Sequence, residues 1–320
     1  KTLEVKETKL KSCFKRKLIV TNNFNDLKNC NIFIATVPTP ITKNCEPDFK
    51  PLKDVCKTIS KLLKKNDIVV FESTVYPGAT EEICAPILEK NDKNLKSGKD
   101  FFLGYSPERV NPGDKVHTID KIDKVVAGQN KKVERVLQQI YSKLTKGKVF
   151  MAKSIKVAEA SKVIENAQRD LNISFINELA LIFDRLGIDT QDVLDAAGTK
   201  WNFLKYKPGL VGGHCISVDP YYLAYKSLKV GHNPNIILSG RKINNEMSSY
   251  VVEKIKTQGK PNLVIFSTAC PVGAGVPVSV APVPSVPDRE ACAISITAVC
   301  PDSRQGASTK SPSGPVTKEV

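Results

Sequence analysis

A helical repeat of unusual length, residues 154–186, constrains the fold of this chain more than any other feature. Apolar residues recur there at intervals of three and four positions, namely Val157, Ala160, Ile164, Ala167, Leu171, Phe175, Leu179 and Ile182. In an α-helix such positions lie on one face. The pattern therefore predicts one continuous helix, well above the usual length for a small domain, with Gly187 as its C-cap.

The segments before this helix alternate short β-rich runs with helical patterns, which is typical of a parallel α/β sheet. We expect strands at 17–21, 31–37, 67–74, 100–108, 124–129 and 147–152, and helices at 52–63, 78–90 and 132–144. After the long helix, further helical patterns cover 189–198, 220–230 and 237–256. The sequence thus predicts an α/β domain followed by a helical domain.

The chain changes character after about residue 259. Pro, Val, Ala and Ser dominate the rest, which is almost free of lysine until Lys310. Proline at this density prevents both helices and sheet pairing. We expect residues 258–320 to form an irregular, mostly disordered tail.

Composition and charge narrow the class of protein. The chain has 320 residues, of which 41% are hydrophobic and 25% charged, as in soluble globular proteins with two domains. It contains neither a membrane-spanning apolar run nor the apolar core of a signal peptide. Its net charge of +15 comes from lysines scattered between apolar positions, without a basic stripe interleaved with aromatic residues. We therefore expect a solvated surface and no nucleic-acid partner.

The nine cysteines form neither a CxxC pair nor a zinc-binding spacing, and their number is odd. We expect no metal site, no disulfide scaffold and a reducing, cytoplasmic setting.

Small and polar residues follow three of the predicted strands, in "TVPTP" (36–40), "STVYPG" (73–78) and "YSPERVNPG" (105–113). In an open parallel sheet the carboxyl ends of strands line the ligand crevice. A crevice there would bring together Thr36, Thr39, Ser73, Thr74 and Glu108. The alternative is a set of ordinary strand-to-helix turns with Thr and Ser as N-caps.

A polar seam runs along the long helix. Lys162 and Asn166 are four residues apart and so share a face, and Glu159, Glu165 and Arg169 belong to the same seam. Such a seam faces either solvent or a cleft between two domains.

The stretch "GLVGGHCISVDPYYL" (209–223) holds the strongest candidate for a nucleophile. The thiolate of Cys215 would be that nucleophile, and the glycines before it remove side chains that would block a ligand. Asp219 would orient a water or a lysine for proton transfer. The alternative is a small hydrophobic residue in a glycine turn.

These motifs together resemble the UDP-glucose/GDP-mannose dehydrogenase family. The resemblance covers residues 1 to about 256 and rests on "TVPTPI", "ESTVYPGATEE", "GYSPERVNPGDK", "SIKVAEASKVIENAQRDLNISFINELA", "AAGTKWNF" and "PGLVGGHCISVDPYYL". The branch that they most resemble comprises the bacterial UDP-N-acetyl-D-glucosamine/galactosamine 6-dehydrogenases of surface-polysaccharide synthesis. The resemblance implies a truncated Rossmann-like NAD-binding domain at 1–150, an all-α central dimerisation domain at 151–257 and a tail at 258–320 outside the family pattern.

The resemblance also implies an activity and its residues. The family oxidises a sugar C6 alcohol to a carboxylate with two NAD, through a thiohemiacetal and a thioester on the cysteine. The implied catalytic residues are Cys215, Lys162, Asn166, Asp219, Glu108 and Thr74. The implied NAD contacts are Thr36, Pro38, Thr39, Ser73, Thr74 and Glu108. The implied UDP-sugar contacts are Glu108, Arg109, Lys162, Asn166, Tyr206, Lys207, Gly209, Leu210, Gly212 and Arg241.

Some family features are replaced or missing. Pro112 stands where the UDP-glucose branch has a glutamate, and Lys205 and Lys207 stand where proline and arginine are usual. A lysine keeps the charge but not the planar fork of arginine. The sequence has no GxGxxG turn for a pyrophosphate and no second nucleotide-binding domain, so we expect a fragment with weak activity or none.

Three alternatives remain. In the first, the chain would be a non-catalytic remnant that dimerises through the long helix. In the second, it would act on UDP-glucose or GDP-mannose instead, and in the third it would be a cysteine hydrolase. The hydrolase is disfavoured because, besides His214, only His117 and His232 are available as a base.

Overall fold

The computed structural model describes residues 7–15, 18–91, 93–110, 114, 116–213 and 215–257. The predicted disordered tail at 258–320, like Pro112 and His214, lies outside these residues. Among the helices of the described part, none combines the length and the apolar character that crossing a membrane requires.

A five-stranded sheet forms the first part of the molecule, in the order β1-β2-β3-β4-β5. The strands are β1 (Ile32–Ala35), β2 (Ile68–Phe71), β3 (Phe102–Tyr105), β4 (Lys124–Gly128) and β5 (Val149–Met151). The α/β class is confirmed, and β1, β2 and β3 are parallel. The sheet is predominantly parallel, as predicted, with one exception: β4 runs antiparallel to β3, and β5 is parallel to β4. A parallel crossover usually contains a helix, and no helix lies in the described part of residues 106–123.

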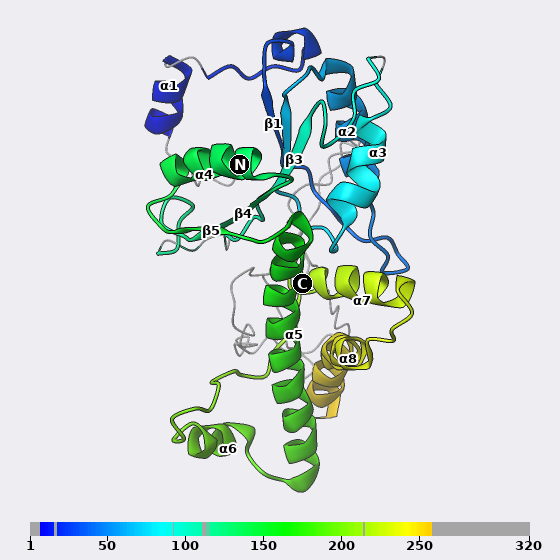
Figure 1. Ribbon diagram of the computed structural model, residues 1–320. Coiled ribbons are helices and arrows are strands. Elements are labelled where there is room, and N and C mark those ends of the chain that lie inside the picture. Colours follow the sequence, from blue (N-terminus) through cyan, green and yellow to red (C-terminus); the bar gives the residue numbers. More distant parts are fainter. Residues whose placement is uncertain are drawn as a thin grey trace, which may run out of the picture.

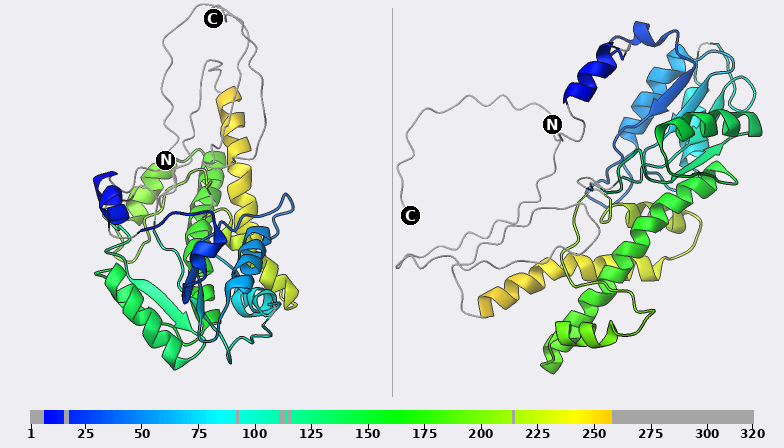
Figure 2. Two further views of the ribbon diagram at one scale, coloured as in Figure 1. Left: turned by 90° about the horizontal axis from the view of Figure 1, so that it is seen from above. Right: turned by 90° about the vertical axis from the view of Figure 1, so that its left-hand side faces the viewer.

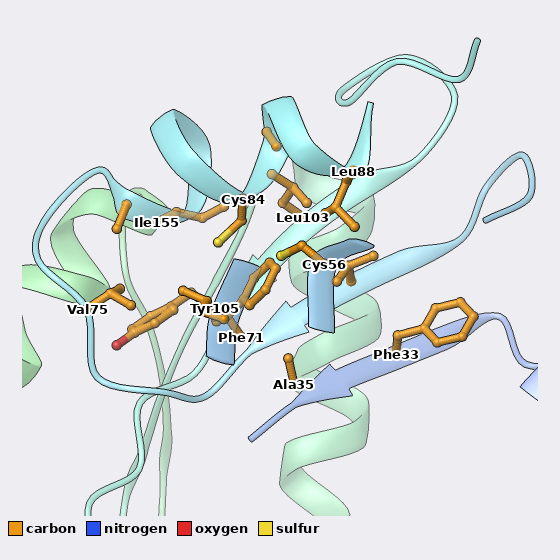
Figure 3. Close-up of a cluster of buried hydrophobic side chains, with 14 of the residues drawn as sticks. Phe33, Ala35, Cys56, Phe71, Val75, Cys84, Leu88, Leu103, Tyr105 and Ile155 are labelled. Atoms are coloured by element: carbon orange, nitrogen blue, oxygen red, sulfur yellow. The ribbon is translucent and has the colours of Figure 1, made fainter. Parts of the chain in front are cut away.

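Helices cover both faces of the sheet (Figure 1). On one face lie α2 (Lys50–Leu62), a π-helical turn η2 (Thr80–Cys84) and α3 (Ala85–Leu88). On the other lies α4 (Lys131–Leu144). Strand β2 is buried throughout and serves both cores, because successive side chains point to opposite faces. Val69 and Phe71 join the larger cluster under α2 and α3 (Figure 3), and Ile68 and Val70 join the cluster under α4.

The predicted strand at 17–21 is wrong. Lys17 lies outside the described residues, and residues 18–21 have no regular structure. A short helix α1 (Glu7–Lys15), which the sequence pattern did not indicate, precedes them, and a 3-10 turn η1 (Phe24–Leu27) follows. A strand needs a partner for its backbone hydrogen bonds. No described strand pairs with residues 18–21, and Ile19 and Val20 are 74% and 77% exposed.

The predicted long helix is confirmed as α5 (Ile155–Leu186), which has 32 residues. Ser154 caps its first turn by accepting a hydrogen bond from the Val157 amide, and Gly187 ends it in the left-handed conformation with φ of 67°. The helices α6 (Thr190–Ala197), α7 (Asp219–Lys229) and α8 (Asn235–Thr257) follow. Both α7 and α8 pack on α5, and Figure 2 shows α8 crossing it.

The buried face of α5 carries as many polar residues as apolar ones. Glu159, Lys162, Asn166, Asp170 and Asn177 are at most 7% exposed. Apolar residues of the predicted helix pattern point outward instead, and Val157, Ile164, Phe175 and Ile182 are between 42% and 56% exposed. The polar seam therefore lies inside the molecule, against the sheet domain, α7 and α8.

Candidate active site

A cavity of about 640 Å³ lies where the segment after β3, the middle of α5 and the loop before α7 meet. Helix α5 contributes Lys162, Glu165, Asn166, Gln168 and Arg169 to its wall. The segment between β3 and β4 contributes chiefly Arg109, His117, Lys121 and Asp123, and the loop contributes Cys215 and Ile216. The structure thus brings a nucleophile and several cations together in one cavity.

Three buried polar side chains form a cluster near Cys215. The Asn166 amide donates a hydrogen bond of 2.5 Å to Oδ2 of Asp219, and Lys162 Nζ lies 3.9 Å from the same oxygen. All three residues are at most 7% exposed. Burial raises the pKa of Asp219 to about 6, against the charge of Lys162 and the hydrogen bond from Asn166. This carboxyl group is therefore able to exchange a proton near neutral pH.

Cys215 lies at the solvent-exposed end of this arrangement. Its carbonyl oxygen accepts hydrogen bonds from the Val218 and Asp219 amides, so the cysteine stands at the turn that enters α7. Burial by the surrounding protein raises the pKa of its thiol, and the charges of Asp219 and Glu108 raise it further. Lys162 and Arg169 lower it. The state of the thiol thus depends on the balance of charge in the cavity.

The glycine loop before Cys215 is open. A Cβ atom on Gly212 or Gly213 would meet nothing within 4 Å, and Gly213 has a φ of 89°. Gly209 is held by Asn177 of α5, whose side chain accepts a hydrogen bond from the Gly209 amide and donates one to its carbonyl. Packing within the described chain does not require glycine at 212, and only backbone conformation requires it at 213.

The residues predicted at the strand ends lie at one edge of the sheet. Thr36 and Pro38 are exposed, and Thr39 and Thr74 are half-buried. Ser73 is buried instead, with its hydroxyl donating to the Val37 carbonyl at 2.5 Å.

The residues after β3 are fixed by local contacts. Glu108 is half-buried, and its carboxylate accepts a 2.5 Å hydrogen bond from the Val110 amide. Arg109 reaches across the cavity to α5, where it pairs with Glu165 at 2.9 Å. It also donates to the Asp123 carbonyl.

Glu159 links the strand-end segment to α5. Its carboxylate accepts hydrogen bonds from the Gly78 amide at 2.5 Å and the Thr80 amide at 2.9 Å, and the residue is fully buried. Burial raises its pKa to about 7, although these hydrogen bonds oppose the shift. Glu159 was seen in sequence only as part of the polar seam, because a contact across about 80 positions leaves no local pattern.

Some predicted substrate residues lie away from this cavity. Tyr206 and Lys207 line a separate hollow of about 300 Å³ beside α6. Arg241 is buried in an ion pair of 2.6 Å with Asp170 and stacks over Tyr221. Conversely, His117 and Lys121 line the Cys215 cavity without having been predicted as site residues, because they sit in an irregular segment without a recognisable spacing.

Comparison with known proteins places both parts of the chain in one family. Residues 2–145 match the NAD binding domain of the UDP-glucose/GDP-mannose dehydrogenase family, and residues 156–246 match the central domain of that family.

Individual relatives agree with this match. Protein CapL of Staphylococcus aureus is 56% identical over 255 residues, which are 80% of this chain and 59% of CapL. The UDP-N-acetyl-D-glucosamine 6-dehydrogenase of Pseudomonas aeruginosa is 55% identical, over 79% of this chain and 60% of its own length. The chain thus spans about three-fifths of the length of these curated relatives.

Solved structures share the fold. A UDP-D-ManNAc dehydrogenase from Pyrococcus horikoshii superposes with a TM-score of 0.71 at 30% identity, over 81% of this chain and 62% of that one. A UDP-glucose dehydrogenase from Pyrobaculum islandicum, with a TM-score of 0.69 and 21% identity over 78% of this chain and 58% of its own, shares the fold.

Proposed function

Because this chain belongs to the UDP-glucose/GDP-mannose dehydrogenase family, we propose that it takes part in NAD-dependent oxidation of a UDP-N-acetyl-hexosamine. The C6 alcohol of the sugar would become a carboxylate for use in surface polysaccharide. Overall, one alcohol, one water and two NAD⁺ give one carboxylate, two NADH and three protons. The name and 55% identity of the P. aeruginosa relative support this substrate class over UDP-glucose and GDP-mannose.

Cys215 is the proposed nucleophile. After the alcohol has been oxidised to an aldehyde, the thiolate adds to C6 and the aldehyde oxygen takes up a proton, which gives a thiohemiacetal. Loss of a hydride and a proton from this adduct gives a thioester. Water then attacks the thioester carbon, the C–S bond breaks, and the thiolate and the carboxylate are released. The exposed position of Cys215 at a 640 Å³ cavity is the observation that carries this proposal.

The buried cluster supplies charge and proton transfer. Lys162 and Asn166 would hold the C6 oxygen while negative charge develops on it. Asp219 contacts both side chains and, with its pKa raised to about 6, would pass protons to and from Lys162. Thr74 would position the hydrolytic water, and Glu108 would act near the thioester.

The polar residues at the edge of the sheet suit the nicotinamide end of NAD. Thr36 is exposed and Thr74 is half-buried, and among the described residues no hydrogen bond engages either hydroxyl group. Together with Pro38, Thr39 and the backbone near Ser73, these residues would hold the nicotinamide end. NAD, when bound there, accepts one hydride in each oxidation.

The experiment supplies the purified chain with NAD and, separately, UDP-N-acetylglucosamine, UDP-N-acetylgalactosamine, UDP-glucose or GDP-mannose. NADH formation is followed by absorbance, and intact mass is checked for an adduct on Cys215. NADH formation that is lost in Cys215→Ser is the expected result, with an N-acetyl-hexosamine preferred. Turnover that persists in Cys215→Ser would contradict the role of the cysteine. Neither NADH nor adduct from a folded chain would contradict the activity.

A second function, dimerisation through α5, is favoured by the exposed apolar residues Val157, Ile164, Phe175 and Ile182. Their spacings of 7, 11 and 7 positions, counted along the printed sequence, place them on one stripe of the helix. We propose that this stripe, called the α5 stripe below, packs against a second copy of the chain. An inactive chain that dimerises would then be a remnant of such an enzyme.

The described cysteines are all free, which suits a cytoplasmic setting.

A further inference from the structure

The ionisable residues around Cys215 are not equally engaged. Arg109 is paired with Glu165, and Lys162 faces Asp219. His117 lines the cavity and contacts Asp114, which does not line it. Arg169, in contrast, forms neither an ion pair nor a side-chain hydrogen bond with any described residue, although it is half-buried in the wall of the cavity.

The position of Arg169 follows from the geometry of α5. It lies seven residues after Lys162 and three after Asn166, which puts all three on one face of the helix. All three side chains line the cavity together with Cys215. The guanidinium therefore stands in the same cavity as the sulfur, on the wall that carries the polar cluster.

Two acidic groups act against ionisation of the thiol. Asp219 on α7 and Glu108 after β3 both raise the pKa of Cys215, in addition to the effect of burial. Lys162 opposes them, but its ammonium group also faces Asp219. Neither Asp219 nor Glu108 lines the cavity itself. The wall carries the acidic residues Glu165 and Asp123, the further basic residues Arg109 and Lys121, and the imidazole of His117. A second cation, one without an acidic partner, would favour the thiolate.

We propose that Arg169 is this cation, and that its guanidinium stabilises the Cys215 thiolate in the open cavity. Arg169 thus acts through Cys215, because its charge changes the ionisation of the thiol. The inference rests on the proposed function only in taking Cys215 as the nucleophile. Arginine suits the task because it stays charged at every relevant pH.

The test is the pH dependence of Cys215 alkylation by iodoacetamide, without NAD or nucleotide sugar. Peptide mapping by mass spectrometry separates Cys215 from the other cysteines, and the Cys45 peptide serves as an internal reference. Arg169→Gln should raise the midpoint of the Cys215 profile by about 0.5 to 1 unit, which slows labelling at neutral pH about threefold to tenfold. The plateau rate at high pH should not fall, because a thiolate of higher pKa is intrinsically no less nucleophilic.

Companion variants separate charge from structure. Arg169→Lys keeps the charge and should retain most of the wild-type midpoint, whereas Arg169→Met should behave like Arg169→Gln. Arg185→Gln removes the same charge from an exposed position on the same helix and should leave the midpoint unchanged. The shift in Arg169→Gln should also shrink at high salt.

Wild-type protein provides a check that needs no substitution. Its midpoint should rise with ionic strength, because salt screens the half-buried Arg169 more than the buried Asp219. An unchanged midpoint in folded Arg169→Gln, an equal shift in Arg185→Gln, or a wild-type midpoint that falls with salt would each overturn the inference. Because no turnover is measured, failure here is distinct from failure of the dehydrogenase proposal.

Discussion

At the scale of single residues, two buried carboxylates connect segments that are distant in the sequence. Glu159 joins the strand-end segment to α5, and Asp219 receives the Asn166 amide beside Lys162. Both have pKa values raised by burial, to about 7 and about 6. Their ionisation is therefore coupled to folding.

This coupling predicts a pH dependence of stability. The pKa of Glu159 is higher in the folded chain than its ordinary value of 4.5, so the folded state holds this proton more tightly. Its stabilising contribution is complete below pH 4.5 and is lost as the pH rises through 7. Asp219 makes a stabilising contribution with the same pH dependence, which is lost as the pH rises from 3.8 to 6. The free energy of unfolding in urea should therefore decrease from about pH 5 to 7.5 more steeply in the wild-type chain than in Glu159→Gln.

The control is Glu178→Gln, which removes an exposed carboxylate from the same helix. It should keep the wild-type slope. The slope is the quantity to compare, since Glu159→Gln also loses an acceptor for one backbone amide. Equal slopes in wild type and Glu159→Gln would show that Glu159 does not titrate in this range.

At the scale of elements, close packing of α8 on α5 helps to bury the polar seam of α5. A Cβ atom on Gly240 of α8 would come within 2.6 Å of Leu171 Cδ2 and 2.8 Å of Ser174 Oγ. The crossing therefore depends on a residue without a side chain. Asn244 lies one turn further along α8, where it donates to Asp170 and accepts from Asn177.

Gly240→Ala should destabilise the chain. Alanine is better than glycine in a helix by about 1 kcal/mol, but the clash should cost more, giving a net loss of roughly 1 to 3 kcal/mol in the free energy of unfolding. Ser249→Ala, at an exposed position of α8, is the matched control and should be neutral or slightly stabilising. Urea unfolding measures both. A stabilised Gly240→Ala would mean that the two helices separate without cost.

Residues 18–20 show the opposite situation, an apolar β-type run with no described partner strand. Leu18, Ile19 and Val20 are 44% to 77% exposed. Exposed apolar segments of this kind promote association. Ile19→Lys with Val20→Lys should therefore increase solubility and reduce light scattering at high concentration, with little change in the unfolding midpoint. A large loss of stability would show that these side chains are packed in solution.

At the scale of the whole molecule, helix α5 presents two different faces, the partly polar buried face that lines the cavity and the exposed α5 stripe. The side that carries Lys162 and Asn166 is covered by the chain itself, whereas the stripe is not. The candidate active site therefore lies away from the proposed dimer contact on α5.

Ile164→Glu with Phe175→Glu should convert a dimer into a monomer, because a dimer would bury both charges without partners. Light scattering coupled to size exclusion measures the mass. Val230→Glu, at an exposed apolar position just after α7, is the control and should remain dimeric. A wild-type chain that is monomeric at high concentration would contradict the proposed dimer.

Local patterns predicted the elements that depend on neighbouring residues. The length of α5 and its end at Gly187 followed from spacing and a glycine C-cap, and the strands from β1 to β5 followed from short β-rich runs between turns. The cluster of Lys162, Asn166 and Asp219 beside Cys215 was anticipated from the motifs, and its catalytic role stays a prediction.

The sequence by itself determined the five strands of the sheet and the helices from α2 to α8, because helical and strand periodicity is a local property of the chain. Only the tertiary structure decided which face of α5 is buried, that β4 reverses direction, that residues 18–21 form no strand, and that Arg241 pairs with Asp170. The physical reason is common to these cases. What covers a helix face, extends a sheet edge or neutralises a charge comes from residues distant in the chain, and its free energy outweighs local preference.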